Sequence, residues 1–278
     1  MATVQILKKK LQVIRSTGKL TKAMKTVSTV KYSKLNSLYG VYERYVSQCS
    51  SLYDTYREDF NSVFSSVNSE APVCYVLIGG NKGMCGGFNS ELQNFFMRLM
   101  EESEKESLVI GCGKKVDAFL QSKKIACESI YIFDDIPSYE KSRELFEHLK
   151  QLLSEGRISA VKTVYQSYVN MMQQKPVCTD LLNFETGGIE AEGPLFVPDR
   201  QTFITSCADR IFTSVLHKRI LESALGAQAA TLITMRSAYD TACEYSNQLE
   251  IEINRKRQSQ VTADVIEISA EYSTEREV

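Results

Sequence analysis

The last eighty residues of the chain contain almost nothing that interrupts a helix. After Pro198 there is no further proline, and Gly226 is the only glycine. So long a stretch without helix breakers is unusual in a globular domain, and it predicts one long helix over residues 199–278. The opening run, residues 1–60, also lacks proline and predicts a second long helix.

Both runs carry apolar or small residues at alternating gaps of four and three, the 3.5-residue repeat of a left-handed coiled coil. In the last run the stripe consists of Leu221, Leu225, Gln228, Leu232, Met235, Tyr239, Ala242, Ser246, Leu249 and Ile253. In the opening run we expect Leu20, Met24, Val27, Lys31, Leu35, Leu38, Tyr42, Tyr45, Cys49, Leu52 and Tyr56. Two successive gaps of four around Lys31 would unwind the supercoil locally. Since each stripe needs a partner, we expect 1–60 and 199–278 to pair as one antiparallel coiled coil.

Acidic residues are absent from the first 42 positions, although the whole chain has a net charge of only −1. This segment contains eight lysines and Arg15. One interpretation is a solvated basic helix face, and the other is a docking surface for an acidic partner. The candidate docking residues are Lys19, Lys22, Lys25 and Lys31. The small net charge gives no general argument for a nucleic-acid or membrane partner.

Closely spaced cysteines and long apolar runs are also missing. No two of the eight cysteines lie within four residues of each other, so the spacings of metal knuckles and redox pairs are absent and free thiols are favoured. No stretch approaches eighteen apolar residues, and the start MATVQILKKK has no apolar core of signal-peptide length. We therefore expect a chain that is neither secreted nor inserted in a membrane.

Proline and glycine are concentrated in the middle of the chain. All five prolines and eleven of the fourteen glycines fall between residues 72 and 198, which predicts a compact central domain over 72–190. Strands are expected at 73–78, 108–111, 129–133, 160–168 and 177–184, with helices at about 89–104, 116–121 and 138–154. The alternation predicts a Rossmann-like α/β sheet whose last two strands form a hairpin. Residues 187–198 are expected to be a loop, and Asp199 to cap the last helix.

A glycine-rich turn, GGNKGMCGGFN, follows the first expected strand. Free backbone amides at a helix start can bind phosphate, but these glycines do not fit G-x-G-x-x-G and no Gly-Lys-Ser/Thr triplet is present. We favour a structural turn where segments pass closely, with nucleotide binding as the alternative. His148 and His217 have no nucleophile at motif spacing, so no catalytic residue, cofactor or metal is expected.

Three stretches, read in order, resemble the gamma subunit of the rotary F-type ATP synthases. They are IRSTGKLTKAMKTVSTVKYSK, the first strand with its GGNKGMCGGFN turn, and ESALGAQAATLITMRSAYDTA followed by NRKRQSQVTADVIEIS. The resemblance covers essentially the whole chain. The sequence departs from the family pattern at Asp264, where glutamate is usual, at Glu271-Tyr272, where Gly-Ala is usual, and at the start of the glycine turn. A proton-driven synthase, a sodium-coupled one and a diverged paralogue therefore stay open.

The resemblance implies a noncatalytic rotor shaft, the central stalk. It would couple ion flow, expected to be of protons, through a c-ring to ATP synthesis or hydrolysis in a ring of alpha and beta subunits. By position, Met24, Arg257, Gln258, Thr262 and Asp264 would contact that ring, and the α/β domain would join the epsilon subunit and the c-ring. The place implied is the cytoplasmic face of the cell membrane, or the mitochondrial matrix side. The alternatives are a gamma-like coiled-coil scaffold of another assembly and a nucleotide-binding α/β enzyme with helical arms.

Overall fold

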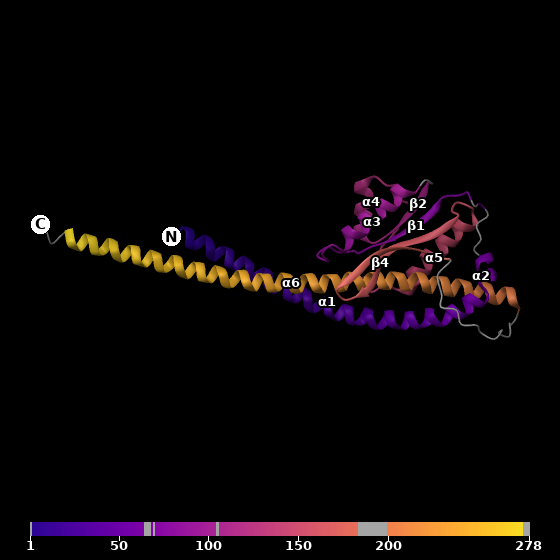
Figure 1. The fold of residues 1–278 in the computed structure, drawn as a ribbon, viewed down its shortest axis with the longest axis horizontal. Coiled ribbons are helices and arrows are strands. Elements are labelled where there is room, and N and C mark those ends of the chain that lie inside the picture. The colour runs from indigo at the N-terminus through magenta and orange to yellow at the C-terminus, as the bar shows by residue number, and fades with distance from the viewer. Residues whose placement is uncertain (1, 64–67, 69, 104–105, 183–198, 275–278) are drawn as a thin grey trace. The chain divides into compact units, whose positions relative to one another are not determined.

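The computed structural model describes residues 2–63, 68, 70–103, 106–182 and 199–274 (Figure 1). It forms two compact units, a smaller one of Met1–Val27 with Thr234–Val278 and a larger one of Ser28–Ile233. Two long helices contribute to both units, α1 (Ala2–Thr55) and α6 (Arg200–Thr274). The loop expected at 187–198 lies outside the described residues.

The larger unit is built on a five-stranded sheet in the order β3-β2-β1-β4-β5. Its strands are β1 (Val73–Ile78), β2 (Ser107–Cys112), β3 (Ser129–Tyr131), β4 (Ala160–Asn170) and β5 (Gln173–Asp180). The first four are parallel to one another, and β5 runs antiparallel to β4. The shorter helices are α2 (Arg57–Val63), α3 (Phe88–Glu102), α4 (Lys114–Lys123) and α5 (Tyr139–Ser154). The predicted α/β fold and its terminal hairpin are confirmed.

Helices cover both faces of this sheet (Figure 1). On one face, Leu92 and Phe96 of α3 and Leu120 of α4 pack against Tyr75 and Leu77 of β1. The other face meets α5, α2 and the parts of α1 and α6 that belong to the larger unit. The fully buried members of that second core include Tyr53, Phe60, Val76, Leu145, Phe146, Leu149 and Phe212. The largest side chains therefore sit where the long helices meet the sheet.

Two local predictions need correction. The last strand was expected at 177–184, but β5 spans Gln173–Asp180 and pairs Pro176 with Gln166. Proline is tolerated there because β5 is an edge strand, whose outer side needs no ladder hydrogen bond. The helix expected at about 89–104 begins at Phe88, with Gly87 as its N-cap, so Asn89 lies inside α3. Its side chain accepts the N–H of Gly80 (3.1 Å), so it holds the glycine turn rather than the helix end.

The stripe that α6 buries was predicted correctly, whereas that of α1 was predicted correctly only in part. All ten stripe residues of α6 are buried or half-buried. On α1, Leu20, Val27 and Tyr45 are exposed by 60%, 53% and 41%. Buried or half-buried residues recur instead at Leu7, Leu11, Ile14, Gly18, Thr21, Lys25, Ser28, Tyr32, Leu35, Tyr39, Tyr42, Val46, Cys49 and Tyr53. This is an uninterrupted heptad repeat, so no local unwinding is needed.

Antiparallel pairing of α1 with α6 is seen within each unit. In the smaller unit Leu7 packs against Leu249 and Ile253. In the larger unit Leu35 packs against Leu221 and Leu225. At the helix start, Asp199 accepts the backbone N–H of Thr202 (2.9 Å) and caps α6 as predicted. The division into segments 1–60, 72–190 and 199–278, and the pairing of the outer two as a single shaft, stay predictions.

Candidate partner-binding surfaces

The glycine turn joins three elements of the larger unit. A Cβ at Gly79 would lie 2.6 Å from Val116 of α4, and one at Gly113 would lie 2.5 Å from the carbonyl oxygen of Gly79. Gly113 also has a φ of +107°, which side-chain-bearing residues rarely adopt. Asn81 donates to the carbonyl of Phe133 and accepts the N–H of Lys114 (3.1 Å). These close approaches confirm the structural interpretation of the turn.

The position where related sheets bind nucleotides is filled here by α6. In doubly wound folds ligands bind beyond the carboxyl ends of the strands where the strand order reverses, here between β1 and β4. The hydroxyl of Ser223 donates to the carbonyl of Ile78, the last residue of β1 (3.2 Å). Beside it, a Cβ at Gly226 would lie only 3.1 Å from the ring of Phe88 at the start of α3. The helix therefore occupies the crevice that a nucleotide would need.

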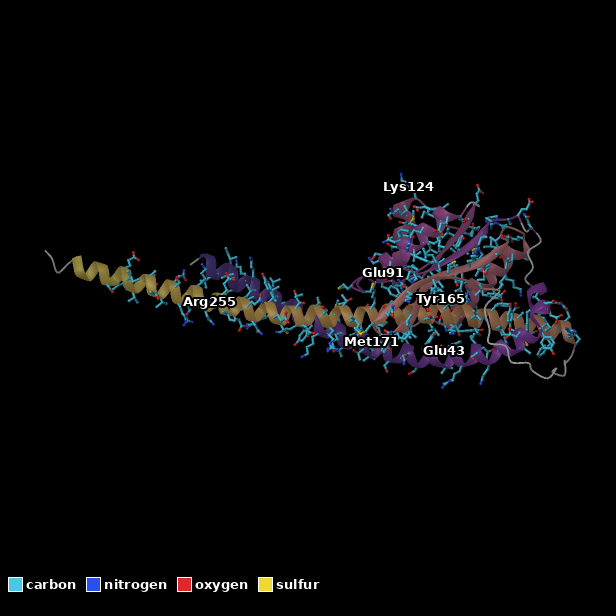
Figure 2. All side chains as sticks on the ribbon, in the orientation of Figure 1. Glu43, Glu91, Lys124, Tyr165, Met171 and Arg255 are labelled. Carbon is cyan, nitrogen blue, oxygen red and sulfur yellow. The ribbon has the colours of Figure 1, made fainter. Side chains whose placement is uncertain are left out.

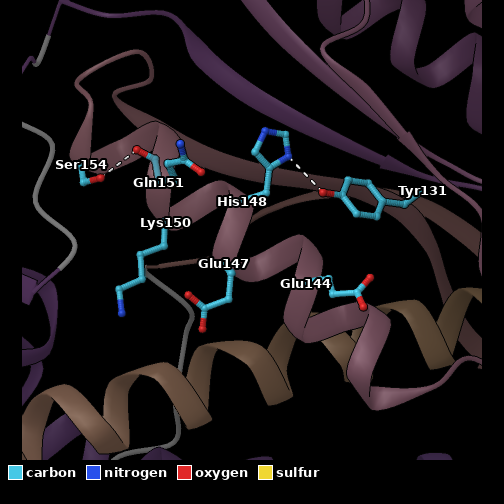
Figure 3. Close-up of a pocket in the computed structure, with 7 residues that line it drawn as sticks. All are labelled: Tyr131, Glu144, Glu147, His148, Lys150, Gln151 and Ser154. Atoms are coloured by element: carbon cyan, nitrogen blue, oxygen red, sulfur yellow. Dashed lines mark hydrogen bonds between the residues drawn. The ribbon is translucent and has the colours of Figure 1, made fainter.

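The described residues include one open groove, of about 690 Å³, along the outer side of α5 (Figure 3). His148 shares a 3.1 Å hydrogen bond with the hydroxyl of Tyr131, and Lys150 donates to both carboxylate oxygens of Asp209 (2.7 Å). The remaining lining consists of Glu144, Glu147, Gln151 and Ser154. The Ser154 hydroxyl in this lining donates to the Gln151 carbonyl one turn back (2.8 Å), a common local bond of a serine in a helix.

Metal and thiol chemistry find little support among the described residues. They contain no group of three or more His, Cys, Asp or Glu side chains that could hold a metal ion. All eight cysteines are free thiols. Burial raises the pKa of Cys74 to about 12 and also raises that of Cys112, so neither forms a thiolate readily. None of the described helices has an apolar stretch that could span a bilayer.

The candidate docking lysines do not share one environment. Lys19 is exposed, and the ammonium of Lys22 lies 6.0 Å from the centre of the Tyr239 ring. Lys25 is half-buried. Lys31 differs from the other three lysines, because its ammonium donates a hydrogen bond to the carboxylate of Asp135. The ammonium of Lys82 donates to the same carboxylate (2.6 Å). The charge of Lys31 is already balanced within the chain, so Lys31 has less to offer an acidic partner.

From residue 254 to residue 269 of α6, every side chain except that of Gln260 is exposed. Arg257, Gln258, Thr262 and Asp264, the four site residues predicted here, are all exposed. Thr262 donates to the Gln258 carbonyl one turn back (2.9 Å), so two of the four lie together on one helix face. The same segment exposes Val261, Val265, Ile266 and Ile268 by 54% to 63%. Figure 2 labels Arg255 near the start of this uncovered stretch. Among the described residues, this end of α6 therefore lacks the partner helix that its earlier turns have.

A second exposed apolar stripe was missed by the sequence analysis. Ile6, Val13, Leu20 and Val27 of α1 are exposed by 53% to 63% and recur every seven residues, so they share one face of the helix. Met24, the remaining predicted site residue, is half-buried. The strict spacing of seven was visible in the sequence, but two of these residues had been assigned to the buried stripe. The smaller unit thus exposes apolar residues on both of its helices.

Comparison with known proteins agrees with this layout. A family model described as ATP synthase matches residues 3–273. The chain is 29% identical to the ATP synthase gamma chain of Rubrobacter xylanophilus, over 97% of each protein. It is 27% identical to that of Pelotomaculum thermopropionicum, over 96% of this chain and 97% of the other.

Solved structures show the same fold. A chain from the mitochondrial ATP synthase of Euglena gracilis (OSCP/F1/c-ring, rotational state 3) matches with a TM-score of 0.72 and 20% identity, over 98% of this chain and 94% of that one. A chain from the central stalk and c-ring of the Tetrahymena thermophila enzyme matches with a TM-score of 0.64 and 16% identity, over 79% of this chain and 99% of that one.

Proposed function

Since the chain belongs to the family of ATP synthase gamma chains, we propose that it is the noncatalytic rotor of an F-type ATP synthase. In this role it couples ion flow through a c-ring to ATP synthesis or hydrolysis in a ring of alpha and beta subunits. The observation that carries the proposal is the uncovered end of α6. A lone helix that exposes four large aliphatic side chains is an aggregation hazard unless a partner encloses it.

The end of α6 suits a bearing. Its aliphatic residues, led by Val265 and Ile266, make non-directional contacts that a sleeve can bury at any rotation angle. Arg257, Gln258, Thr262 and Asp264 supply polar groups on the same segment, which we propose contact the catalytic ring at particular angles. Apolar contacts would then lower friction while the polar ones set the stopping positions.

The smaller unit offers a second contact through α1. The first 42 residues of the chain contain no acidic side chain. The exposed stripe at Ile6, Val13, Leu20 and Val27 lies on the same helix as Lys19 and Lys22. We propose that an acidic, amphipathic part of the catalytic ring contacts α1 here, with Met24 at its edge. Positive charge beside an apolar stripe would attract such a partner and hold it.

We propose that the larger unit is noncatalytic and that it binds the epsilon subunit and the c-ring. The filled crevice at the end of β1 supports a noncatalytic role, since α6 occupies the place of a nucleotide. The complex would then lie peripherally on the membrane, on the cytoplasmic side in a bacterium or the matrix side in a mitochondrion. The coupling ion follows from the c-ring, which is a different chain.

Co-expression with alpha, beta and epsilon subunits tests the proposal. We expect a stoichiometric complex with ATPase activity, and no micromolar nucleotide binding by the pure chain in calorimetric titration. Val265→Asp with Ile266→Asp should weaken the complex, because two carboxylates would enter an apolar sleeve. Val169→Asp is the matched control, since Val169 of β4 is 52% exposed but lies in the other unit. If the two variants assemble equally well, a scaffold role is favoured instead. The same conclusion follows if the chain does not join the alpha/beta ring but binds nucleic acid with an affinity that falls steeply with salt.

A further inference from the structure

A buried arginine attaches α6 to both strands of the hairpin. Arg219 is only 7% exposed. Its Nη1 donates to the hydroxyl of Thr163 on β4, and its Nη2 donates to the carbonyl of Asp180 on β5, both at 2.8 Å. The planar guanidinium fork thus binds two acceptors in directions that a lysine could not reproduce.

A buried glutamate attaches the next turn of the same helix. Glu222 is 5% exposed, and its Oε1 accepts the hydroxyl of Ser167 (2.7 Å) and the backbone N–H of Tyr168 (2.9 Å). Beside it, the Ser223 hydroxyl donates to the carbonyl of Ile78. One short stretch of α6 therefore makes directional contacts to β1, β4 and β5.

The geometry of these contacts resists rotation of the helix on the sheet. Arg219 and Glu222 are three residues apart, about 4.5 Å along a helix axis. Their β4 partners, Thr163 and Tyr168, are five residues apart, about 16 Å along a strand. The two side chains therefore diverge along β4. Two directional hydrogen bonds to separated points on β4 fix the angle at which α6 lies on the hairpin. A single bond would not fix this angle.

Cohesion between α6 and the larger unit does not require these charges. Leu216, Ile220 and Leu221 of the same turns are buried, with at most 2% exposure. Burial lowers the pKa of Arg219, which reports the unfavourable desolvation of its charge, although Tyr165 and Glu222 oppose this effect. Well-packed apolar residues commonly stabilise such a position as well or better. The polar pair therefore calls for an explanation other than stability.

We propose that Arg219 and Glu222 are positioning residues that fix the angular setting of α6 on the β4–β5 hairpin, so that torque passes between the α/β domain and α6 without slip. The inference rests on the proposed rotor function and names the joint through which that function works. Apolar surfaces hold together but permit sliding, whereas hydrogen bonds from buried charged groups weaken steeply when their direction changes.

The double substitution Arg219→Met with Glu222→Met tests the joint, because methionine fills similar volume without directional bonds. The variant is studied in the whole complex, reconstituted in lipid vesicles. ATP hydrolysis and ATP-driven ion uptake are measured on the same vesicles. We expect hydrolysis to continue while the number of ions moved per ATP falls below that of the wild type. Arg219→Lys, which keeps the charge and loses the fork, should show a smaller loss.

The matched control is Ile220→Ala, which removes a buried apolar side chain between the two residues and leaves their polar contacts in place. At equal loss of thermal stability it should keep the wild-type ratio of ion uptake to hydrolysis. An unchanged ratio in the double variant, or an equal fall in Ile220→Ala, would overturn the proposal. If the double variant does not assemble, Arg219→Lys is the deciding variant. A wild-type ratio of ion uptake to hydrolysis in Arg219→Lys would then overturn the proposal. Failure of the wild-type chain to join the ring would instead refute the proposed function.

Discussion

The two units use the same pair of helices in different ways. In the larger unit α1 and α6 meet through large aromatic side chains, such as Tyr53 and Phe212, whose ring centres lie 5.8 Å apart. In the smaller unit aliphatic residues around Leu7 meet, and small residues meet farther along, where a Cβ at Gly18 would lie 3.6 Å from that of Ala242. The larger unit buries most of its large apolar residues within the chain, whereas the smaller one exposes many of its own.

This difference indicates a division of labour. The larger unit has the buried core of an independently stable domain, with two clusters covering both faces of its sheet. The smaller unit has one small cluster around Leu7, Leu249 and Ile253. Its close small-residue packing keeps the helix pair narrow, and its exposed aliphatic residues need partners. A narrow helix pair with apolar outer faces is what a shaft inside a sleeve requires.

The largest difference between the units should appear on deleting one large side chain. Phe212 is fully buried and stacks on Phe146, with ring centres 6.5 Å apart. Phe212→Ala should lower the free energy of unfolding by about 3–5 kcal/mol, because it leaves a cavity in a packed core. Ile266→Ala in the smaller unit should change it by no more than about 0.5 kcal/mol. Urea unfolding of the full chain measures both, and similar costs would contradict the comparison.

A second effect depends on pH and on the larger unit alone. Burial lowers the pKa of His217 to about 4, against a smaller opposing effect of Glu140. The unfolded chain, where the imidazole pKa is 6.5, therefore takes up a proton first as the pH falls. Stability should be complete above pH 6.5 and decrease by about 3 kcal/mol between pH 6.5 and 4. Unfolding at several pH values measures this decrease.

Two variants separate the contribution of His217 to the pH dependence of stability from that of carboxylates, which can also take up protons as the pH falls. His217→Phe should remove most of the difference, although it also loses the 2.8 Å contact with the Ser142 hydroxyl. His148→Gln, at a half-exposed position, is the control for removing an imidazole elsewhere in the same unit. If His217→Phe follows the wild-type curve, the imidazole is already charged or accessible in the folded protein, contrary to its burial in the structure.

The smallest effect concerns the ion pairs of Asp135. Burial alone would raise its pKa, but hydrogen bonds from Lys31 and Lys82 lower it overall. The stabilisation is therefore present at neutral pH and lost as the pH falls through the folded-state pKa of Asp135. Asp135→Asn should lower stability by about 1 kcal/mol, less at high salt. Asp134→Asn, at the exposed neighbouring position, is the control, and equal losses would show that the pairs contribute nothing.

The sequence predicted the fold well because the fold follows local patterns. The bounds of β1 were correct, and the long helix free of proline became α6. Part of the α1 stripe was predicted wrongly because the heptad was placed on the large apolar residues. From Gly18 to Ser28 the helix buries small and polar residues, and their larger apolar neighbours Leu20 and Val27 face outward. A strict heptad count would have found the correct register.

The polar contacts of the larger unit could not be predicted in the same way. Arg219 is bound to a carbonyl 39 positions away, and His217 to a serine 75 positions away. No local pattern separates a buried arginine from a solvated one on a helix, because burial depends on which strand packs there. The exposed site residues at the end of α6 were placed by resemblance, and their contacts with a catalytic ring stay predictions.

Amide hydrogen exchange over residues 255–270 tests the account most directly, since nearly all side chains of this segment of α6 are exposed in the part of the chain that the structure describes. In the free chain these amides should exchange fast, because a single exposed helix opens readily. In the complex with alpha and beta subunits they should become strongly protected, while residues 204–221 of the larger unit should be protected in both states. Fast exchange of 255–270 in the assembled complex would contradict the account, because the end of α6 would then be an unbound tail and not the enclosed end of a shaft.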